Sequence, residues 1–281
     1  MTENAAERDD PRAVAATIDW IPILLVVAVA LAALPLIGSV STWITLTVAA
    51  LAMGMMIFIM ASGLTLVFGL MDVINFGHGV FISVGAYVSL LVLWPLAGWV
   101  DSSSVPLNVL VLLLCIALSM IVSGVFGWAF ERVIIRPVYG QHLKQILVTM
   151  GGLIVVEQLL YALVGGNPIT ISLPQSFRGG LAFGPDVVVE RFRLIAVGVG
   201  FIVFIGMLLV LNRTRIGLLV RAGVENPEMV EALGYRIRRL FIGVFIAGSA
   251  LAGLGGVMWG FYQQTLTVGM GLQVLVLIFI V

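Results

Sequence analysis

The sequence predicts an all-α membrane protein, a bundle of about eight transmembrane helices, and its composition and hydropathy support this. Of the 281 residues, 61% are hydrophobic and only 10% are charged, whereas soluble domains have about 45–50% apolar and about 25% charged residues. The mean hydropathy is +1.19. These values exclude a water-soluble enzyme, a nucleic-acid-binding domain and a disordered chain, and leave a polytopic membrane protein.

Apolar runs with at most one charged residue indicate where the helices lie, because crossing the hydrocarbon core takes about 20 apolar residues. An eighth run begins near Leu266 and is still apolar at Val281. A chain end inside hydrocarbon leaves backbone carbonyls unpaired, so we expect this last helix to be cut short and the natural chain to continue. The seven preceding runs are Ile21–Gly38, Trp43–Leu70, Val80–Ala97, Val105–Phe130, Gln145–Gly165, Leu194–Leu211 and Leu240–Tyr262.

The charges predict the orientation. Residues 1–20 are too long and too acidic for the start of a signal peptide, so we interpret them as a cytoplasmic tail that precedes a transmembrane domain over 21–281. With the N-terminus inside, eleven of the fourteen basic residues face the cytoplasm, as the positive-inside rule requires. The three on the outside are Arg178, Arg191 and Arg193.

The connection after the second run is more polar than the runs on either side. The run Trp43–Leu70 has 28 residues, or about 42 Å of straight helix, which exceeds the thickness of one bilayer. Gly63 and Gly69 lie in its second half. A helix that breaks before it leaves the membrane, with irregular backbone lining a cavity, would explain both observations. Spacing alone favours the other interpretation, an ordinary cytoplasmic turn whose glycines serve the bend.

The same connection supplies candidate substrate-path residues. Asn75 and His78 offer hydrogen bonds to a polar solute, and Gly77 and Gly79 let backbone approach closely. Glu157, in the middle of the fifth run, is a further candidate because an ionisable group at membrane depth is costly and usually functional. A structural role for Glu157, protonated or paired with an arginine, stays open.

Two loops have internal structure. The segment Gly166–Arg193, called here the hairpin segment, alternates turn signals with short β-like stretches, which predicts a small hairpin on the outer face. It is either a docking surface or merely a long loop. The second loop, 212–239, holds six arginines and is called here the arginine-rich loop.

A short capped helix is expected inside the arginine-rich loop. Asn226, Pro227 and Glu228 form a helix start, and Gly234 is suited to the left-handed position after the helix. About two turns of helix are too short to be stable alone, so this helix must dock, either on its own bundle or on a cytoplasmic protein. The candidate coupling residues are Met229, Val230, Glu231, Ala232, Leu233 and Gly234.

Small residues recur every fourth position in the seventh run. Gly248, Ala252, Gly256 and Gly260 form one ridge of the type that permits close helix contact in lipid. We predict a tight helix–helix seam along this ridge.

No catalytic or metal site is expected. His78 and His142 are the only histidines, and no cysteine or carboxylate cluster joins them at metal-ligand spacing. Ser249 lacks the Gly-x-Ser-x-Gly setting of a nucleophile. The sequence also lacks a P-loop for ATP. We therefore expect no enzyme activity and no cofactor in this chain.

Five blocks of sequence, spread over most of the chain, resemble branched-chain amino acid permeases of ABC importers. The blocks are Gly63–Gly79, Arg136–Val138, Thr214–Gly217, Met229–Tyr235 and Ala247–Val257. The resemblance implies a bacterial or archaeal inner-membrane subunit that moves branched-chain amino acids by alternating access. It also implies a second homologous permease, two cytoplasmic ATPase subunits that bind ATP, and an extracytoplasmic substrate-binding protein. Residues 231–234 match the motif that couples such permeases to their ATPases.

Two other functions remain open. Permeases for urea and short amides share these motifs, and nothing in the sequence separates them from amino acid permeases. An ion-coupled secondary transporter would need internal repeats and paired intramembrane carboxylates, of which only Glu157 is clearly at membrane depth.

Overall fold

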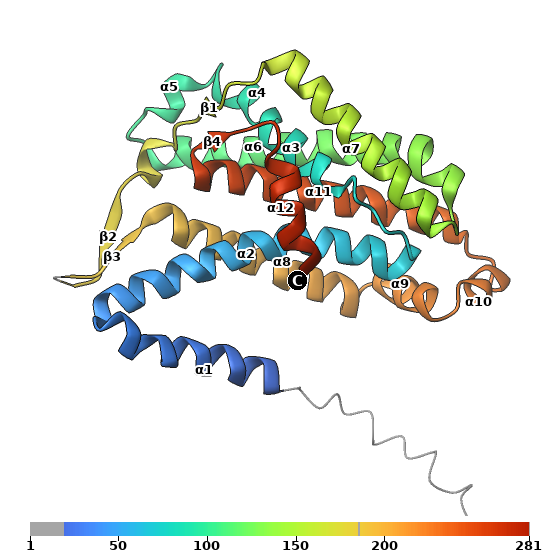
Figure 1. Cartoon of the computed structure of the whole chain (residues 1–281), viewed down its shortest axis with the longest axis horizontal. Helices are drawn as coiled ribbons and strands as arrows, with labels where there is room; N and C mark the ends of the chain where they lie inside the picture. Colours follow the sequence, from blue (N-terminus) through green and yellow to red (C-terminus); the bar gives the residue numbers. More distant parts are fainter. Residues whose placement is uncertain (1–19, 185, 281) are drawn as a thin grey trace, which may run out of the picture. The chain divides into compact units, whose positions relative to one another are not determined.

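The computed structural model describes residues 20–184 and 186–280, and their fold is helical (Figure 1). The expected N-terminal tail, 1–20, lies outside the described residues except for Trp20, where the first helix begins. The chain divides into two compact units, 1–47 and 48–281. In the first unit, helix α1 (Trp20–Ile37) is linked to the start of α2 (Val40–Met71) by the Trp43 indole, which donates a 2.7 Å hydrogen bond to the Ala30 carbonyl.

The predicted apolar runs form helices of two lengths, as expected for a helical membrane bundle. Five helical segments are long and apolar enough to cross a membrane, and three shorter apolar helices accompany them. The long segments are Val40–Met71, Val105–Val138, His142–Val164, Arg191–Arg213 and Ile237–Gln263; the shorter ones are Leu24–Ile37, His78–Leu93 and Met270–Ile280. By length and composition, these helices are those of a multi-pass membrane protein.

Of the two interpretations of the second run, the break does not occur and the ordinary turn does. Helix α2 is continuous over 32 residues, and its last helical residue is Met71. Gly63 is used for packing, since a Cβ built on it would lie against the carbonyl of Gly248. The helix ends at Asp72, which takes a left-handed φ of 49° and donates its N–H to the Phe68 carbonyl at 2.9 Å.

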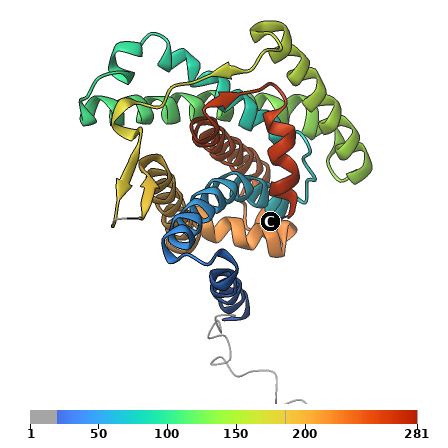
Figure 2. The ribbon, with the colours of Figure 1, turned by 60° about the vertical axis from the view of Figure 1, so that its left-hand side comes forward.

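Helix α11 (Ile237–Gln263) is the most buried of the five long spans. It packs against α6 (Val105–Phe130) and α3 (His78–Val88), so these three helices form the centre of the second unit (Figure 2). Close approach depends on glycine, because a Cβ on Gly256 would collide with the Ile82 carbonyl and one on Gly85 with the backbone of Gly253.

The small-residue ridge of α11 faces three neighbours: helix α2, helix α3 and Leu266. A Cβ on Gly248 would lie 2.6 Å from the Gly63 carbonyl oxygen of α2. Farther along the ridge, Ala252 is fully buried and Gly256 meets α3. Gly260 packs beside Leu266, whose side chain would lie 2.7 Å from a Cβ at that position.

The remaining elements connect these helices. The third predicted run forms α3, α4 (Leu90–Leu93) and α5 (Ala97–Val100) rather than one helix. After α6 the chain widens into a π-helical turn, Glu131–Ile135, and then tightens into a 3-10 turn, Arg136–Val138. The other helices are α7 (His142–Val164), α8 (Arg191–Arg213), α9 (Arg215–Glu225), α10 (Pro227–Ala232) and α12 (Met270–Ile280).

The hairpin segment contains the predicted hairpin. Strands β2 (Gly180–Ala182) and β3 (Val188–Glu190) pair antiparallel, with Leu181 opposite Val189. A second pair was not anticipated: β1 (Ile169–Thr170) pairs with β4 (Thr265–Leu266), which lies between α11 and α12. This pair fastens the hairpin segment to the turn that precedes α12.

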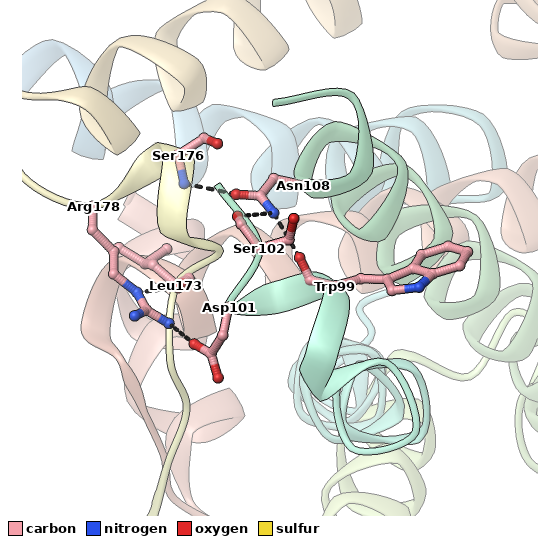
Figure 3. Close-up of polar contacts among 7 residues, drawn as sticks. All are labelled: Trp99, Asp101, Ser102, Asn108, Leu173, Ser176 and Arg178. Carbon is pink, nitrogen blue, oxygen red and sulfur yellow. Dashed lines mark hydrogen bonds and ion pairs between the residues drawn. The ribbon is translucent and has the colours of Figure 1, made fainter. Parts of the chain in front are cut away.

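A polar cluster joins the hairpin segment to the start of α6 (Figure 3). The fully buried Asn108 amide donates to the carbonyls of Trp99 at 2.7 Å and Ser102 at 3.2 Å. Its oxygen accepts the Ser176 N–H at 2.6 Å. Arg178 adds an exposed ion pair with Asp101 at 2.7 Å. Asn108 therefore satisfies backbone groups from two segments at once.

Candidate substrate path and coupling helix

The α2–α3 connection buries its two predicted polar side chains completely. Asn75 and His78 are both 0% exposed. His78 Nε2 lies 3.1 Å from the Met60 carbonyl oxygen of α2. Within the described part of the chain, neither the amide nitrogen nor the amide oxygen of Asn75 has a hydrogen-bond partner, and His78 Nδ1 also lacks one.

Buried polar atoms without partners are uncommon in folded proteins. Each such atom costs roughly 1–3 kcal/mol in lost hydration. Asn75 and His78 are therefore expensive as purely structural residues, and their three unpaired atoms give the connection an unused capacity for hydrogen bonds.

The glycines beside them allow tight packing. A Cβ on Gly77 would lie 2.5 Å from the Phe130 ring and 3.0 Å from the Asn75 amide oxygen. A Cβ on Gly79 would lie 2.6 Å from the Gly271 carbonyl oxygen of α12. Any larger residue at Gly77 or Gly79 would force the start of α3 away from α6 or α12.

The remaining bonds of this connection come from distant elements. The Phe76 N–H donates to the Thr149 hydroxyl of α7 at 3.2 Å. The Phe76 ring stacks on Phe279 of α12, with ring centroids 4.8 Å apart. The connection is thus held between α7 and α12 rather than projecting as a free turn.

Glu157 lies apart from Asn75 and His78. It is half-buried on α7 and lines a cavity with Ser83, Val268 and neighbouring apolar side chains, and this lining includes neither Asn75 nor His78. The cavity volume is ≈ 10 Å³, about the space of one water molecule. In this conformation the cavity has no room for an amino acid.

The coupling helix α10 forms with the predicted caps. The Asn226 side chain accepts the Met229 N–H at 2.9 Å. At the other end Gly234 has a φ of +86° and donates to the Glu231 carbonyl at 2.8 Å, while Tyr235 donates to the Val230 carbonyl at 3.2 Å. These two bonds form a Schellman motif, so both ends of a six-residue helix are satisfied locally.

One side chain of α10 anchors it to the rest of the chain. Val230 is 3% exposed, whereas Met229 is 58% and Leu233 69% exposed. Val230 shares a cavity lining with Leu219 of α9 and Leu240 of α11. The helix therefore docks on its own bundle through Val230 and leaves Met229 and Leu233 exposed.

A buried acid directly after α6, Glu131, was not predicted from the sequence. Glu131 is 1% exposed and accepts a 3.0 Å hydrogen bond from the Tyr139 hydroxyl. Burial, reinforced by this neighbouring carboxylate, raises the pKa of Tyr139. Glu131 begins a π-helical turn, a geometry that is frequent at functional sites and has no simple sequence signal.

Comparison with known proteins agrees with this architecture. Residues 46–281 match a family described as "Branched-chain amino acid transport system / permease component". No solved structure matches the chain.

Three relatives are similar over most of the chain. The high-affinity branched-chain amino acid transport system permease protein BraD of Pseudomonas aeruginosa is 29% identical, over 76% of this chain and 69% of the relative. The corresponding LivH protein of Salmonella typhimurium is 26% identical, over 72% and 65%. The probable LivH permease of Methanocaldococcus jannaschii is 24% identical, over 73% and 62%. The chain thus spans about two thirds of the length of these relatives.

Proposed function

Because the chain belongs to the family of branched-chain amino acid transport permeases, we propose that it forms half of the transmembrane path of an ATP-driven importer. Branched-chain or related amino acids are the proposed substrates, and the path opens alternately to the two sides of the membrane. A second, homologous permease completes the path, two ATPase subunits bind and hydrolyse ATP, and a binding protein delivers the solute. The chain itself has a transport role and no catalytic one.

The orientation follows from the arginines. The arginine-rich loop and α10 face the cytoplasm of a bacterial or archaeal cell, with the chain in the inner membrane and its N-terminus inside. The positive-inside rule supports this placement, because eleven of the fourteen basic residues then lie on one side.

The exposed face of α10 is the observation that favours an ATP-driven importer. Met229 and Leu233 are large apolar side chains that remain exposed on a short helix outside the five long spans. An exposed apolar patch on a well-capped helix is typical of a protein–protein contact. We propose that residues 229–234 fit into an ATPase subunit and transmit its closure.

The substrate path is proposed to include the start of α3. Asn75 and His78 hold unpaired polar atoms, which suit the ammonium and carboxylate groups of an amino acid. Both side chains are fully buried in this conformation, so they meet the solute only in another step of alternating access. Because Gly77 and Gly79 have no side chains, the start of α3 can move during that step while it stays close to Phe130 and Gly271.

A pair of substitutions at Gly234 tests the coupling role of α10. A Cβ at this position has nothing within 4 Å, so only the φ of +86° opposes a side chain. Valine in the left-handed region costs roughly 1–2 kcal/mol, a factor of about 5–30, whereas asparagine tolerates this region. We expect Gly234→Val to weaken capture of the co-expressed ATPase subunits and ATP-driven leucine uptake by that factor, and Gly234→Asn to retain both.

The same assay separates the competing functions. The complex is reconstituted in proteoliposomes with its binding protein, and uptake of leucine and urea is compared with and without ATP. Leucine uptake that requires ATP is the expected result. Uptake of urea alone indicates an amide permease. The proposal is overturned if the full-length protein captures no ATPase subunit and Gly234→Val leaves leucine uptake unchanged.

A further inference from the structure

Five arginines from two distant parts of the chain surround one open cavity. The cavity volume is ≈ 720 Å³, within the range of about 300–1,000 Å³ typical of ligand sites. Arg132 and Arg136 come from the turns after α6, and Arg236, Arg238 and Arg239 come from the start of α11. Within residues 20–184 and 186–280, none of the five forms an ion pair.

The position of three of these arginines is electrostatically unfavourable without an anion. Arg238 and Arg239 lie in the first turn of a 27-residue helix that has no acidic residue there, and Arg236 is its N-cap residue, whose side chain does not cap the helix. A helix N-terminus carries a partial positive charge and is stabilised by negative groups. Among the residues that line the cavity, Glu231 is the one carboxylate. A bound anion would neutralise this excess.

A second cavity, almost entirely apolar, adjoins the first. Its volume is ≈ 630 Å³, and it is lined by aliphatic side chains of α2, α6, α8, α9 and α11, with Arg239 as its one charged residue. Arg239 also lines the basic cavity. A smaller cavity contains Arg236, Arg239 and Leu240, so it shares residues with both. Arg239, at the start of α11, therefore borders both the basic and the apolar cavity.

We propose that this pair of cavities binds an anionic phospholipid. Its phosphate contacts Arg236, Arg238 and Arg239, and one acyl chain enters the apolar cavity between α8, α9 and α11. The chemistry suits an amphiphile, because basic pockets between membrane helices bind acidic lipid head groups. An acidic surface of an ATPase subunit would match the arginines but would leave the apolar cavity without a function.

Direct lipid binding to the purified full-length chain tests this proposal. Native mass spectrometry measures binding of palmitoyl-oleoyl phosphatidylglycerol, of phosphatidylcholine with the same acyl chains, and of inorganic phosphate. We expect phosphatidylglycerol to bind at least tenfold more tightly than either comparison. Arg239→Gln should weaken the binding of phosphatidylglycerol about fivefold, which is the contribution of one arginine near an acidic lipid. Arg213→Gln, in the same loop but outside the cavities, should have no effect.

Filling the apolar cavity tests the acyl-chain half of the proposal. Gly243 and Gly206 both line it, and a Cβ on either has nothing within 4 Å, so leucine fits without a clash. Gly243→Leu and Gly206→Leu should each weaken phosphatidylglycerol tenfold or more, since each displaced methylene costs about a factor of four in affinity. Gly198→Leu is the matched control, because Gly198 also has open space on α8 and lies outside the cavity.

Three results would overturn the proposal. Equal affinity for phosphatidylglycerol and phosphatidylcholine shows that the arginines do not select an anionic head group. Phosphate binding as tight as phosphatidylglycerol, unaffected by Gly243→Leu, indicates a free-phosphate site. Loss of ATPase capture in Arg239→Gln with unchanged phosphatidylglycerol binding assigns the arginines to the protein partner instead.

Discussion

Replacing Asn75 by leucine distinguishes a solute-contacting side chain from a structural one, because the two roles predict opposite changes in stability. Asn75 and Asn108 are both 0% exposed. The amide of Asn108 makes three hydrogen bonds to backbone groups, whereas both polar atoms of the Asn75 amide are unpaired. Asn108→Leu is therefore the matched control, with the same substitution at equal burial.

The expected magnitudes follow from these bonds. Asn108→Leu removes three hydrogen bonds; the Trp99 carbonyl still accepts the Ser102 N–H at 3.3 Å, whereas the Ser102 carbonyl and the Ser176 N–H lose the Asn108 amide as a partner, at roughly 1–3 kcal/mol for each group left without a partner. Leucine at Asn75 removes two unpaired atoms and orphans no group, so the free energy of unfolding should stay the same or rise by about 1–3 kcal/mol. If Asn75 donates to or accepts from the solute, uptake should fall about tenfold for each 1.4 kcal/mol of lost interaction.

Two measurements on the same preparations decide the matter. Thermal unfolding of the purified chain reports stability, and ATP-driven leucine uptake in proteoliposomes reports transport. We expect Asn75→Leu to unfold at or above the wild-type temperature and to transport at least tenfold more slowly. A lower unfolding temperature together with normal uptake would refute the reasoning and make Asn75 a structural residue.

Three further predictions concern packing, the hairpin segment and the energy source. Gly248→Ala should lower the free energy of unfolding by roughly 1–3 kcal/mol, since its Cβ would lie 2.6 Å from a backbone oxygen, whereas Gly243→Ala meets open space and should be neutral in thermal unfolding. Arg178→Gln should lower the free energy of unfolding by roughly 1–3 kcal/mol in the same assay, because it removes the 2.6 Å hydrogen bond from Nε to the Leu173 carbonyl as well as an exposed ion pair that contributes at most about 1 kcal/mol. Glu157→Gln should leave uptake dependent on ATP and insensitive to a proton gradient; loss of a gradient-driven component would support the ion-coupled alternative.

Local signals predicted the elements that depend on neighbouring residues alone. The hydrophobic runs located the long spans, because length and polarity decide whether a segment can cross a membrane. The two ends of α10 were equally predictable, since an N-cap oxygen at Asn226 and a left-handed Gly234 act within one turn. The β2–β3 hairpin followed from turn residues for the same reason.

Features that depend on distant residues were missed or mistaken. Gly63 suggested a break in α2, but its role is fixed by Gly248 on another helix, and sequence spacing does not show that contact. The β1–β4 pair consists of two strands of two residues each, too short to have a pattern. The role of Asn108 was not predicted, because its hydrogen-bond partners lie in other segments.

The packing of α11 indicates how a movement of α10 would reach the proposed path. Only Tyr235 and Arg236 separate the Schellman glycine of α10 from the start of α11. Farther along α11, its backbone approaches that of α3 so closely that no Cβ fits between Gly256 and Ile82. Close-packed interfaces transmit displacement rather than absorb it. In the proposed mechanism α11 and α3 therefore shift together, and the first residue of α3 is His78.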